Sequence, residues 1–382
     1  TPAIASSDLT YSITDTAGQM LAELSNDANY ISNAIRVTVT DVVSISNFNL
    51  IDAQTSTNII LAGGVGDTAV NIAPSGTATA GFTAAITQDP DVAVTVITGT
   101  ATVAELIAID AVTAGVVTAT VAENDLTTLK TLTDANSNNI LTIVVTDTSA
   151  DAGELASVDG ITNVTVDAQT NVTTITGSAA EIIALLSAAG TNIAANVNFV
   201  IDEAASAAYI QTIAAATTGE VTATLLTGER TLDLSSSTAS KNTIILNDDG
   251  VAVTGSSQSD VITVGAGADT LNLGAGDDVV NVNSGDGNGD TVNTGAGADN
   301  IFIDDGAVGA SDVITIDAGA GTDKVIVSGT NFFTGSPTFV GIETISVEDS
   351  SDVTNDPTGS VTVSGTATQG QTLTAANTLA DA

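Results

Sequence analysis

The sequence lacks two residue types on which much enzyme chemistry depends, since its 382 residues include no cysteine and no histidine. Without cysteine there is no disulfide, thiolate zinc site, iron–sulfur cluster or cysteine nucleophile. Without histidine there is no Ser-His-Asp triad, no HExxH zinc motif and no imidazole metal site. Carboxylates, hydroxyls, amides and backbone carbonyls remain, and this set of oxygen donors suits hard cations, above all calcium.

Positive charge is also scarce. The chain has 5 basic and 45 acidic residues, which gives a formal net charge of -40. Such a chain repels the phosphate backbone of nucleic acids and the surface of anionic membranes. The most apolar stretch, 179–201, is interrupted by Glu181 and by several amide and hydroxyl side chains, so it falls short of the ~20 apolar residues of a membrane span. We therefore expect no nucleic-acid partner and no membrane insertion.

The chain is nevertheless rich in apolar residues, at 43%, and only 13% of its residues are charged. A disordered acidic polymer would be poor in valine, isoleucine and leucine, so the composition predicts a folded chain with a buried core. The sequence starts TPAIASS and ends NTLADA, without an initial methionine or a signal segment. We expect an internal piece of a larger polypeptide or a processed product.

A first repeat covers much of the chain before Arg230. Short Val/Ile/Thr runs begin at positions 94, 117, 141, 172, 197 and 221, and the spacings between successive starts are 23, 24, 31, 25 and 24. Such β-branched runs predict short strands. Capping boxes, which start helices, are predicted at Thr102–Glu105, Ser178–Glu181 and Thr16–Gln19. The alternation predicts parallel strands with crossover helices, arranged as an α/β solenoid of ~24-residue strand–helix units; an ordinary doubly wound α/β domain is the alternative.

Two segments fit this period less well. In 37–92, the run VVSISNFNLIDAQ (42–54) has the composition of a strand. The segment 161–176 holds two strand runs only a few residues apart. We interpret both as β insertions or as solenoid turns that lack a helix.

A second, glycine-rich repeat extends from about residue 255 to 327. Aspartate recurs in it at positions 260, 269, 278, 290, 299, 312 and 323, and the intervals between these positions are 9, 9, 12, 9, 13 and 11. Its units are VGAGADTLN (264–272), LGAGDDVVN (273–281), VNSGDGNGDTVN (282–293), TGAGADNIF (294–302) and DAGAGTDKVIV (317–327).

These units resemble the repeats of the RTX (repeats-in-toxin, or hemolysin-type) calcium-binding proteins, whose motif is G-G-x-G-x-D-x-U-x. The resemblance covers about 75 of the 382 residues. It departs from the motif at the first glycine, where Val264, Leu273 and Thr294 stand. The resemblance implies a parallel β-roll that binds Ca²⁺ between stacked glycine-rich loops. A calcium-free acidic β-solenoid is the alternative.

The geometry of such a roll can be argued from the residues. Each nonapeptide supplies a tight turn and a short strand whose large apolar residue points inward, as we expect for Leu271, Val280 and Ile301. Two units make one coil, so each loop stacks on the loop two units further along the chain. We therefore expect three aspartate pairs: Asp260 with Asp278, Asp269 with Asp290, and Asp278 with Asp299.

The predicted metal-site residues are aspartates and glycines of these loops: Asp260, Gly265, Gly267, Asp269, Gly274, Gly276, Asp278, Asp290, Gly295, Gly297, Asp299, Asp312 and Asp323. Glycine permits backbone conformations that aim carbonyl oxygens into the gap between loops, and aspartate completes the about six to eight oxygens that calcium prefers. The insertion at 282–290 and the longer gap before Asp312 are expected to interrupt the ladder, so that sites beyond Asp299 are the least supported.

The patterns predict a β-rich repeat protein in four parts. Residues 1–92 form the β-rich or α/β start of the solenoid, and residues 93–250 form its α/β repeats. Residues 251–350 form the calcium-binding β-roll, closed by an aromatic cap that includes Phe332, Phe333 and Phe339. Residues 351–382 form a linker and a partial Ig-like or strand-exchange tail.

The RTX resemblance implies bacterial secretion, usually through a type I system, with folding triggered outside the cell by calcium. We expect an extracellular, calcium-stabilised structural protein of the cell surface: a surface layer, adhesin or matrix filament that associates with itself or with neighbouring modules. A carbohydrate- or surface-binding adhesin module, with surface polysaccharide as its partner, is the first alternative. A polysaccharide-active enzyme with a carboxylate pair is the second. Because triad and zinc chemistry lack their histidine, we predict that the chain is not an enzyme.

Overall fold

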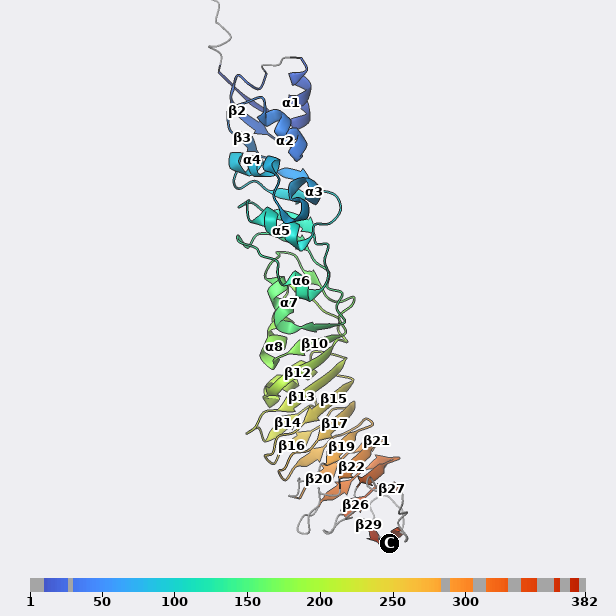
Figure 1. Cartoon of the computed structure of the whole chain (residues 1–382). Coiled ribbons are helices and arrows are strands. Elements are labelled where there is room, and N and C mark those ends of the chain that lie inside the picture. Colours follow the sequence, from blue (N-terminus) through green and yellow to red (C-terminus); the bar gives the residue numbers. More distant parts are fainter. Residues whose placement is uncertain are drawn as a thin grey trace, which may run out of the picture. The chain divides into compact units, whose positions relative to one another are not determined.

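The computed structural model describes residues 10–26, 30–282, 289–304, 314–328, 338–348, 361–364 and 372–377 (Figure 1). The chain divides into two compact units. The N-terminal unit comprises residues 1–172 with 188–193, and the C-terminal unit comprises residues 173–187 with 194–382. The predicted four-part domain division stays a prediction.

In the N-terminal unit, short strands alternate with short helices. Nine of its described strands form three parallel sheets, with orders β1-β2-β3, β4-β5-β6-β7 and β11-β9. In four of the strand pairs, the paired residues lie 22 to 24 positions apart in the chain. The strands are β1 (Tyr11–Asp15), β2 (Ala34–Val39), β3 (Ile59–Leu61), β4 (Val65–Asp67), β5 (Val94–Val96), β6 (Val117–Thr120), β7 (Ile140–Thr142), β8 (Ser149–Asp151), β9 (Val166–Asp167) and β11 (Thr191–Asn192). The helices are α1 (Ala17–Leu24), α2 (Ile45–Asp52), α3 (Ala69–Ile72), the 3-10 turn η2 (Pro74–Gly76), α4 (Ala80–Gln88), α5 (Val103–Asp110), α6 (Leu126–Leu129) and α7 (Ala152–Asp159).

Two of the predicted capping boxes are complete and one is half formed. At α5, the Thr102 hydroxyl accepts from the Glu105 N–H, and the Glu105 carboxylate accepts from the Thr102 N–H at 2.8 Å. The same exchange joins Ser178 and Glu181. At α1, the Thr16 N–H donates to the Asp15 carboxylate at 2.8 Å instead of to Gln19.

Carboxylates from one coil also cap helices of the preceding coil. Each accepts a hydrogen bond from the N–H of a helix's first residue, where the amide has no partner within the helix. The four pairs are Ala17 with Asp41 (2.7 Å), Ile45 with Asp67 (3.0 Å), Val103 with Glu123 (2.9 Å) and Leu126 with Asp147 (2.9 Å). We call these four acids the capping carboxylates. They join successive coils, because the donor and the acceptor lie one coil apart.

The strand interpretation of residues 42–54 was wrong, since Ile45–Asp52 form helix α2. Ile45, Phe48 and Ile51 recur at helical spacing and are buried. The Ser44 hydroxyl caps the helix by accepting from the Asn47 N–H. Helices α3 and α4 also lie within 37–92, so this segment does not lack helices.

The C-terminal unit changes from strand–helix coils to coils with two strands. It contains helices α8 (Ala179–Ser187) and α9 (Ala207–Ala214). Its first sheet has the order β10-β12-β13-β15-β17-β19-β22-β25-β27, and its second sheet β14-β16-β18-β20-β23-β26-β29-β28 (Figure 1). The first-sheet strands are β10 (Thr174–Gly177), β12 (Asn198–Ala205), β13 (Glu220–Leu225), β15 (Lys241–Ile245), β17 (Ser259–Thr263), β19 (Val279–Val282), β22 (Asn300–Asp304), β25 (Lys324–Ser328) and β27 (Thr344–Glu348). The second-sheet strands are β14 (Thr231–Asp233), β16 (Ala252–Thr254), β18 (Thr270–Asn272), β20 (Thr291–Asn293), β23 (Thr315–Asp317), β26 (Thr338–Val340), β28 (Val361–Ser364) and β29 (Thr372–Asn377). Two further strands, β21 (Ala296–Gly297) and β24 (Ala320–Gly321), pair in the loops.

The two sheets enclose one apolar stack. The strands alternate buried and more exposed residues, and the predicted Leu271, Val280 and Ile301 occupy buried positions. Pairing is parallel and in register from coil to coil, so each inward residue lies beside its counterpart. The prediction of a β-rich chain with parallel strands and a roll-like repeat is therefore confirmed.

The second sheet ends in two antiparallel strands. Strand β29 pairs antiparallel with β26 and with β28, so β26 is not an edge strand. Phe339 of the predicted aromatic cap is buried in β26, whereas Phe332 and Phe333 lie outside the described residues. Within the described part of the chain, no helix has the length and apolar character of a membrane span.

The capping carboxylate Asp67 is expected to stabilise the N-terminal unit. Replacement of the buried Asp67 by alanine removes acceptors from the Ile45 and Thr68 N–H groups and from the Asn71 amide. We expect the free energy of unfolding to fall by about 2 kcal/mol, the scale of hydrogen bonds to charged groups. Urea denaturation followed by circular dichroism measures this. Asp202→Ala, at an exposed position, is the control; equal destabilisation by both variants would contradict the capping role.

Candidate metal centre

The connections between the two sheets of the roll stack into two columns of loops. The first loop column consists of residues 255–260, 273–278, 294–299 and 318–323, which lead into β17, β19, β22 and β25. The second loop column begins with residues 246–251 and 264–269, which lead into β16 and β18. Hydrogen bonds between loop backbones join neighbouring loops of the first column, among them Ala296 N–H to Gly274 O (2.9 Å) and Ala320 N–H to Gly295 O (2.7 Å).

A ladder of aspartates runs along the first loop column. The N–H of each aspartate donates to the carboxylate of the aspartate one coil further on: Asp260 to Asp278 at 2.8 Å, Asp278 to Asp299 at 2.9 Å, and Asp299 to Asp323 at 2.9 Å. The Asp323 N–H donates to the Glu343 carboxylate at 2.7 Å. We call Asp260, Asp278, Asp299 and Asp323 the aspartate ladder. All four side chains are fully buried.

The second loop column holds a shorter series of the same kind. The Val251 N–H donates to the Asp269 carboxylate at 2.7 Å, and the Asp269 N–H donates to the Asp290 carboxylate at 2.8 Å. Both aspartates are buried. The predicted site residue Asp312 lies outside the described residues.

The structure thus brings together the three aspartate pairs that spacing predicts. It also carries the ladder past the insertion, where we expected a break. The step between partners grows from 18 residues to 21 and then to 24. Strands β18, β20 and β23 stay in register across these steps, so the longer intervals do not break the pairing of the second sheet.

The predicted glycines lie where neighbouring loops approach most closely. A β-carbon added at Gly265, Gly267, Gly274, Gly276, Gly295 or Gly297 would come within 1.8 to 2.7 Å of a backbone atom of the adjacent loop. Gly297 also has a φ of 154°, a conformation that other residues rarely adopt. These positions therefore exclude side chains for reasons of packing as well as conformation.

Burial raises the free energy of the ionised form of these carboxylates, and their pKa values rise as a result. Burial, together with repulsion from Asp260 and Asp299, raises the pKa of Asp278 to about 7. Burial, together with repulsion from Asp290, raises the pKa of Asp269 to about 6. The pKa values of Asp260 and Asp323 are also raised, mainly by burial.

Three ladder carboxylates retain an oxygen that no protein group satisfies. The Oδ2 atoms of Asp278, Asp299 and Asp323 are buried and have no hydrogen-bond partner. Buried polar atoms normally have partners, so these oxygens are what a bound cation would complete. In the described residues, no three acidic side chains converge as a metal cluster, and carbonyl oxygens or water would supply the remaining ligands. The donor set is entirely oxygen and fits calcium.

Asp260 and Asp269 differ from these three. Asp260 accepts from the Ser256 N–H at 2.7 Å and from the Asn242 amide at 2.8 Å. Asp269 accepts from the Gly265 N–H at 3.2 Å with its second oxygen. Protein donors therefore satisfy both oxygens of each, and the need for a cation is greatest from Asp278 onward.

Sequence reasoning missed Glu343 and Asn242, the residues at the two ends of the ladder. Glu343 follows the same signature as Asp299, a glycine two residues before the acid and an apolar residue two after it. A search that accepted glutamate would have found it. Asn242 lies 18 residues before Asp260, at the spacing of one coil.

Comparison with known proteins identifies the repeat. The family model of the RTX calcium-binding nonapeptide repeat, in four copies, matches residues 254–288. This range contains Asp260, Asp269 and Asp278. No match was found among curated proteins or among solved structures.

The raised pKa values predict the pH dependence of the calcium-free roll. The folded chain binds protons at Asp269 and Asp278 more tightly than the unfolded chain, in which both carboxyls titrate near 3.8. This stabilisation is complete below that value and is lost as the pH rises through about 6 to 7. Urea midpoints in calcium-free buffer are expected to fall over this interval. With saturating calcium they are expected to rise instead, because the ion requires ionised carboxylates. A flat calcium-free profile would contradict the assignment.

Gly297 provides a test of loop packing. Replacement by alanine would place a β-carbon 1.8 Å from the Gly276 carbonyl oxygen. We expect the roll to lose at least ~2 kcal/mol of stability even in calcium, because neighbouring backbone must move. The matched control is Gly18→Ala in helix α1, where an added β-carbon meets nothing within 4 Å and alanine is the better helix former. Thermal unfolding of both variants decides; an unchanged Gly297→Ala roll would overturn the packing argument.

Proposed function

Because the chain carries RTX calcium-binding repeats, we propose that it is an extracellular structural protein whose C-terminal roll is stabilised by calcium. The observation that supports this best is the set of three buried, unpartnered carboxylate oxygens at Asp278, Asp299 and Asp323. A bound calcium ion supplies the positive charge that these carboxylates lack. Its role at these positions is to hold neighbouring loops together.

Three residues of the ladder, Asp278, Asp299 and Asp323, each have two roles in this proposal. One carboxylate oxygen accepts the N–H of the preceding ladder residue, which fixes the orientation of the side chain. The other oxygen is then presented to the ion. The neighbouring glycines allow loop backbones to approach, which keeps the gap between coils small. Since metal affinity and the folded roll need the same arrangement, binding and folding are coupled.

An extracellular location is consistent with the repeats, which are typical of secreted proteins. The charge of -40 favours the same route. A chain that repels itself stays extended where calcium is scarce and folds where calcium is abundant. We propose secretion through a type I system on this basis.

The proposed role at the cell surface is that of a surface-layer, adhesin or filament component. Strand–helix coils in the N-terminal unit are proposed to form an α/β solenoid, an architecture in which each coil contacts only its neighbours. Such proteins present extended surfaces and suit association with further copies or modules. We propose that the chain is not an enzyme, since it has no histidine or cysteine and its buried carboxylates in the roll serve the ladder.

The calcium dependence and the assembly can be tested together. We expect circular dichroism to show loss of β-structure when calcium is chelated, and electron microscopy to show loss of ordered assemblies. Asp278→Asn and Asp299→Asn are expected to weaken calcium binding roughly tenfold or more, because each removes a charged ligand. Asp202→Asn is the control.

Other outcomes would favour other functions. Fold and assembly that are unchanged by chelation would contradict the proposal. Saturable binding on a glycan array in calcium would favour a carbohydrate-binding adhesin module. Turnover of a polysaccharide that is lost in a carboxylate variant would establish an enzyme.

A further inference from the structure

The first loop of the second column departs from the repeat at two positions. Asn247 lies where Gly265 lies one coil later, since a β-carbon at Gly265 would meet the Asn247 carbonyl oxygen at 1.8 Å. Val251 lies where Asp269 lies, since its N–H donates to that aspartate. The loop therefore lacks the aspartate through which later coils contribute to the columns. Its backbone must be held by something else.

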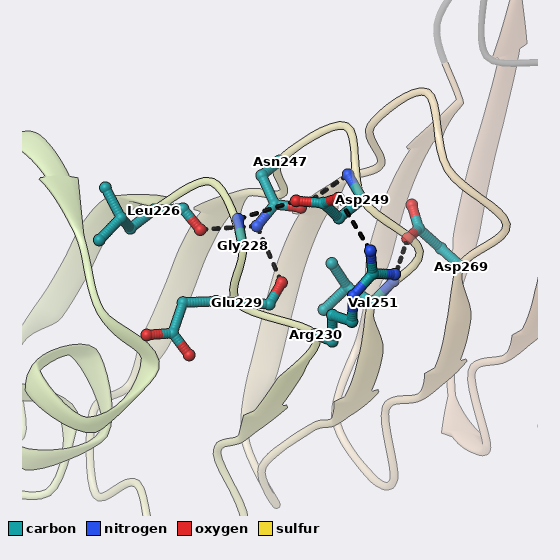
Figure 2. A network of polar contacts seen from close by, with 8 residues as sticks. All are labelled: Leu226, Gly228, Glu229, Arg230, Asn247, Asp249, Val251 and Asp269. Atoms are coloured by element: carbon teal, nitrogen blue, oxygen red, sulfur yellow. Dashed lines mark hydrogen bonds and ion pairs between the residues drawn. The ribbon is translucent and has the colours of Figure 1, made fainter.

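The Asn247 side chain holds it. Figure 2 shows the amide pointing into the gap between this loop and the preceding one. Its Nδ2 donates to the Leu226 carbonyl at 2.7 Å and to the Glu229 carbonyl at 2.9 Å. Its Oδ1 accepts from the Asp249 N–H at 2.9 Å. One buried, uncharged amide thus binds two carbonyl oxygens of the preceding loop and an N–H of its own loop. A cation at this place would coordinate the carbonyl oxygens instead.

The carboxylate of Asp249 in this loop also has partners within the protein. The Asp249 carboxylate accepts from the Gly228 N–H at 2.8 Å and forms an ion pair with the Arg230 guanidinium at 3.1 Å (Figure 2). Arg230 is mostly exposed, so the ion pair contributes little. The buried amide of Asn247 therefore contributes more to holding the two loops together than this exposed ion pair does.

The first loop column begins in the same way. The Asn242 amide donates to the Asp260 carboxylate at 2.8 Å, and Asn242 is fully buried. Its own Oδ1 accepts from the Ser237 hydroxyl at 3.2 Å. An asparagine therefore precedes Asp260 by one coil in the first column, and another lies in the first loop of the second column. Within the described residues, the unpartnered aspartate oxygens occur in later coils.

We propose that Asn242 and Asn247 take the place of cations at the start of the two columns, so that the coil containing β14 and β15 folds without calcium. This coil is then the template on which the calcium-dependent coils assemble in order. The inference rests on the proposed calcium dependence of the roll and adds a direction to its folding. It also implies that the residue at position 247 determines whether this loop is held by a side-chain amide or needs a cation.

Hydrogen exchange followed by mass spectrometry tests this on the full chain. In chelator, amides of residues 226–247 are expected to stay protected, while those of residues 270–282 and 291–304 exchange rapidly. In calcium, all of these segments are expected to be protected. Loss of protection from every segment in chelator would contradict the role of this coil as a template. The proposal that calcium stabilises the roll would still hold. Protection that persists in every segment would overturn the calcium dependence itself and the template with it.

Asn247→Asp isolates the amide. Aspartate keeps the acceptor for the Asp249 N–H but loses both donors to the Leu226 and Glu229 carbonyls. In chelator we expect exchange in residues 226–247 to become roughly 10- to 100-fold faster, the loss expected when buried acceptors lose their donors. Millimolar calcium is expected to restore protection, because a carboxylate with two carbonyls is a donor set that calcium accepts.

Asn272→Asp, at an exposed position on β18, adds the same charge without touching these carbonyls and is the control. Equal acceleration in both variants would overturn the role of the amide. Acceleration in Asn247→Asp that calcium does not reverse would overturn the equivalence between amide and cation.

Discussion

Ionised carboxylates stacked at the spacing of β-strands repel one another. When they are buried, this repulsion destabilises the fold unless positive charge or hydrogen-bond donors balance it. Adjacent parallel strands lie about 4.8 Å apart. At an effective dielectric constant of about 20, two unit charges at that distance repel by on the order of 3 kcal/mol. Asp278, Asp299 and Asp323 are fully buried and follow one another in such a stack. Their negative charges need to be balanced, and we propose that calcium ions balance them.

The same constraint explains how acids are distributed in the two units. In the N-terminal unit, each of the four capping carboxylates faces a helix amide of the neighbouring coil, so each charge meets the positive end of a peptide group. In the roll, Asp278, Asp299 and Asp323 each accept one backbone N–H from the preceding coil and keep a second oxygen unpartnered. The negative charge of the chain is therefore partly structural in both units, and we propose that an external cation balances it in the roll.

The sequence predicted those features that depend on regular spacing. The even recurrence of aspartate predicted the Asp260–Asp278 pair, and the Thr102–Glu105 capping box was visible from its residue types. Features that break the spacing were hidden. The steps of 21 and 24 residues to Asp299 and Asp323 suggested an interrupted ladder, because sequence intervals do not show that the strands keep their register when the steps lengthen. Glu343 was missed because its side chain differs from that of the repeat. Helix α2 was taken for a strand because its β-branched residues outweighed the helical spacing of its buried ones.

We propose that cations complete the unpartnered carboxylate oxygens of Asp278, Asp299 and Asp323. A crystal structure of the protein in calcium, with anomalous difference density, tests this most directly. We expect ions in the first loop column at about 2.3–2.6 Å from the Oδ2 atoms of these three aspartates. Absence of such ions at saturating calcium, with those oxygens bonded to protons or to other protein groups, would contradict it.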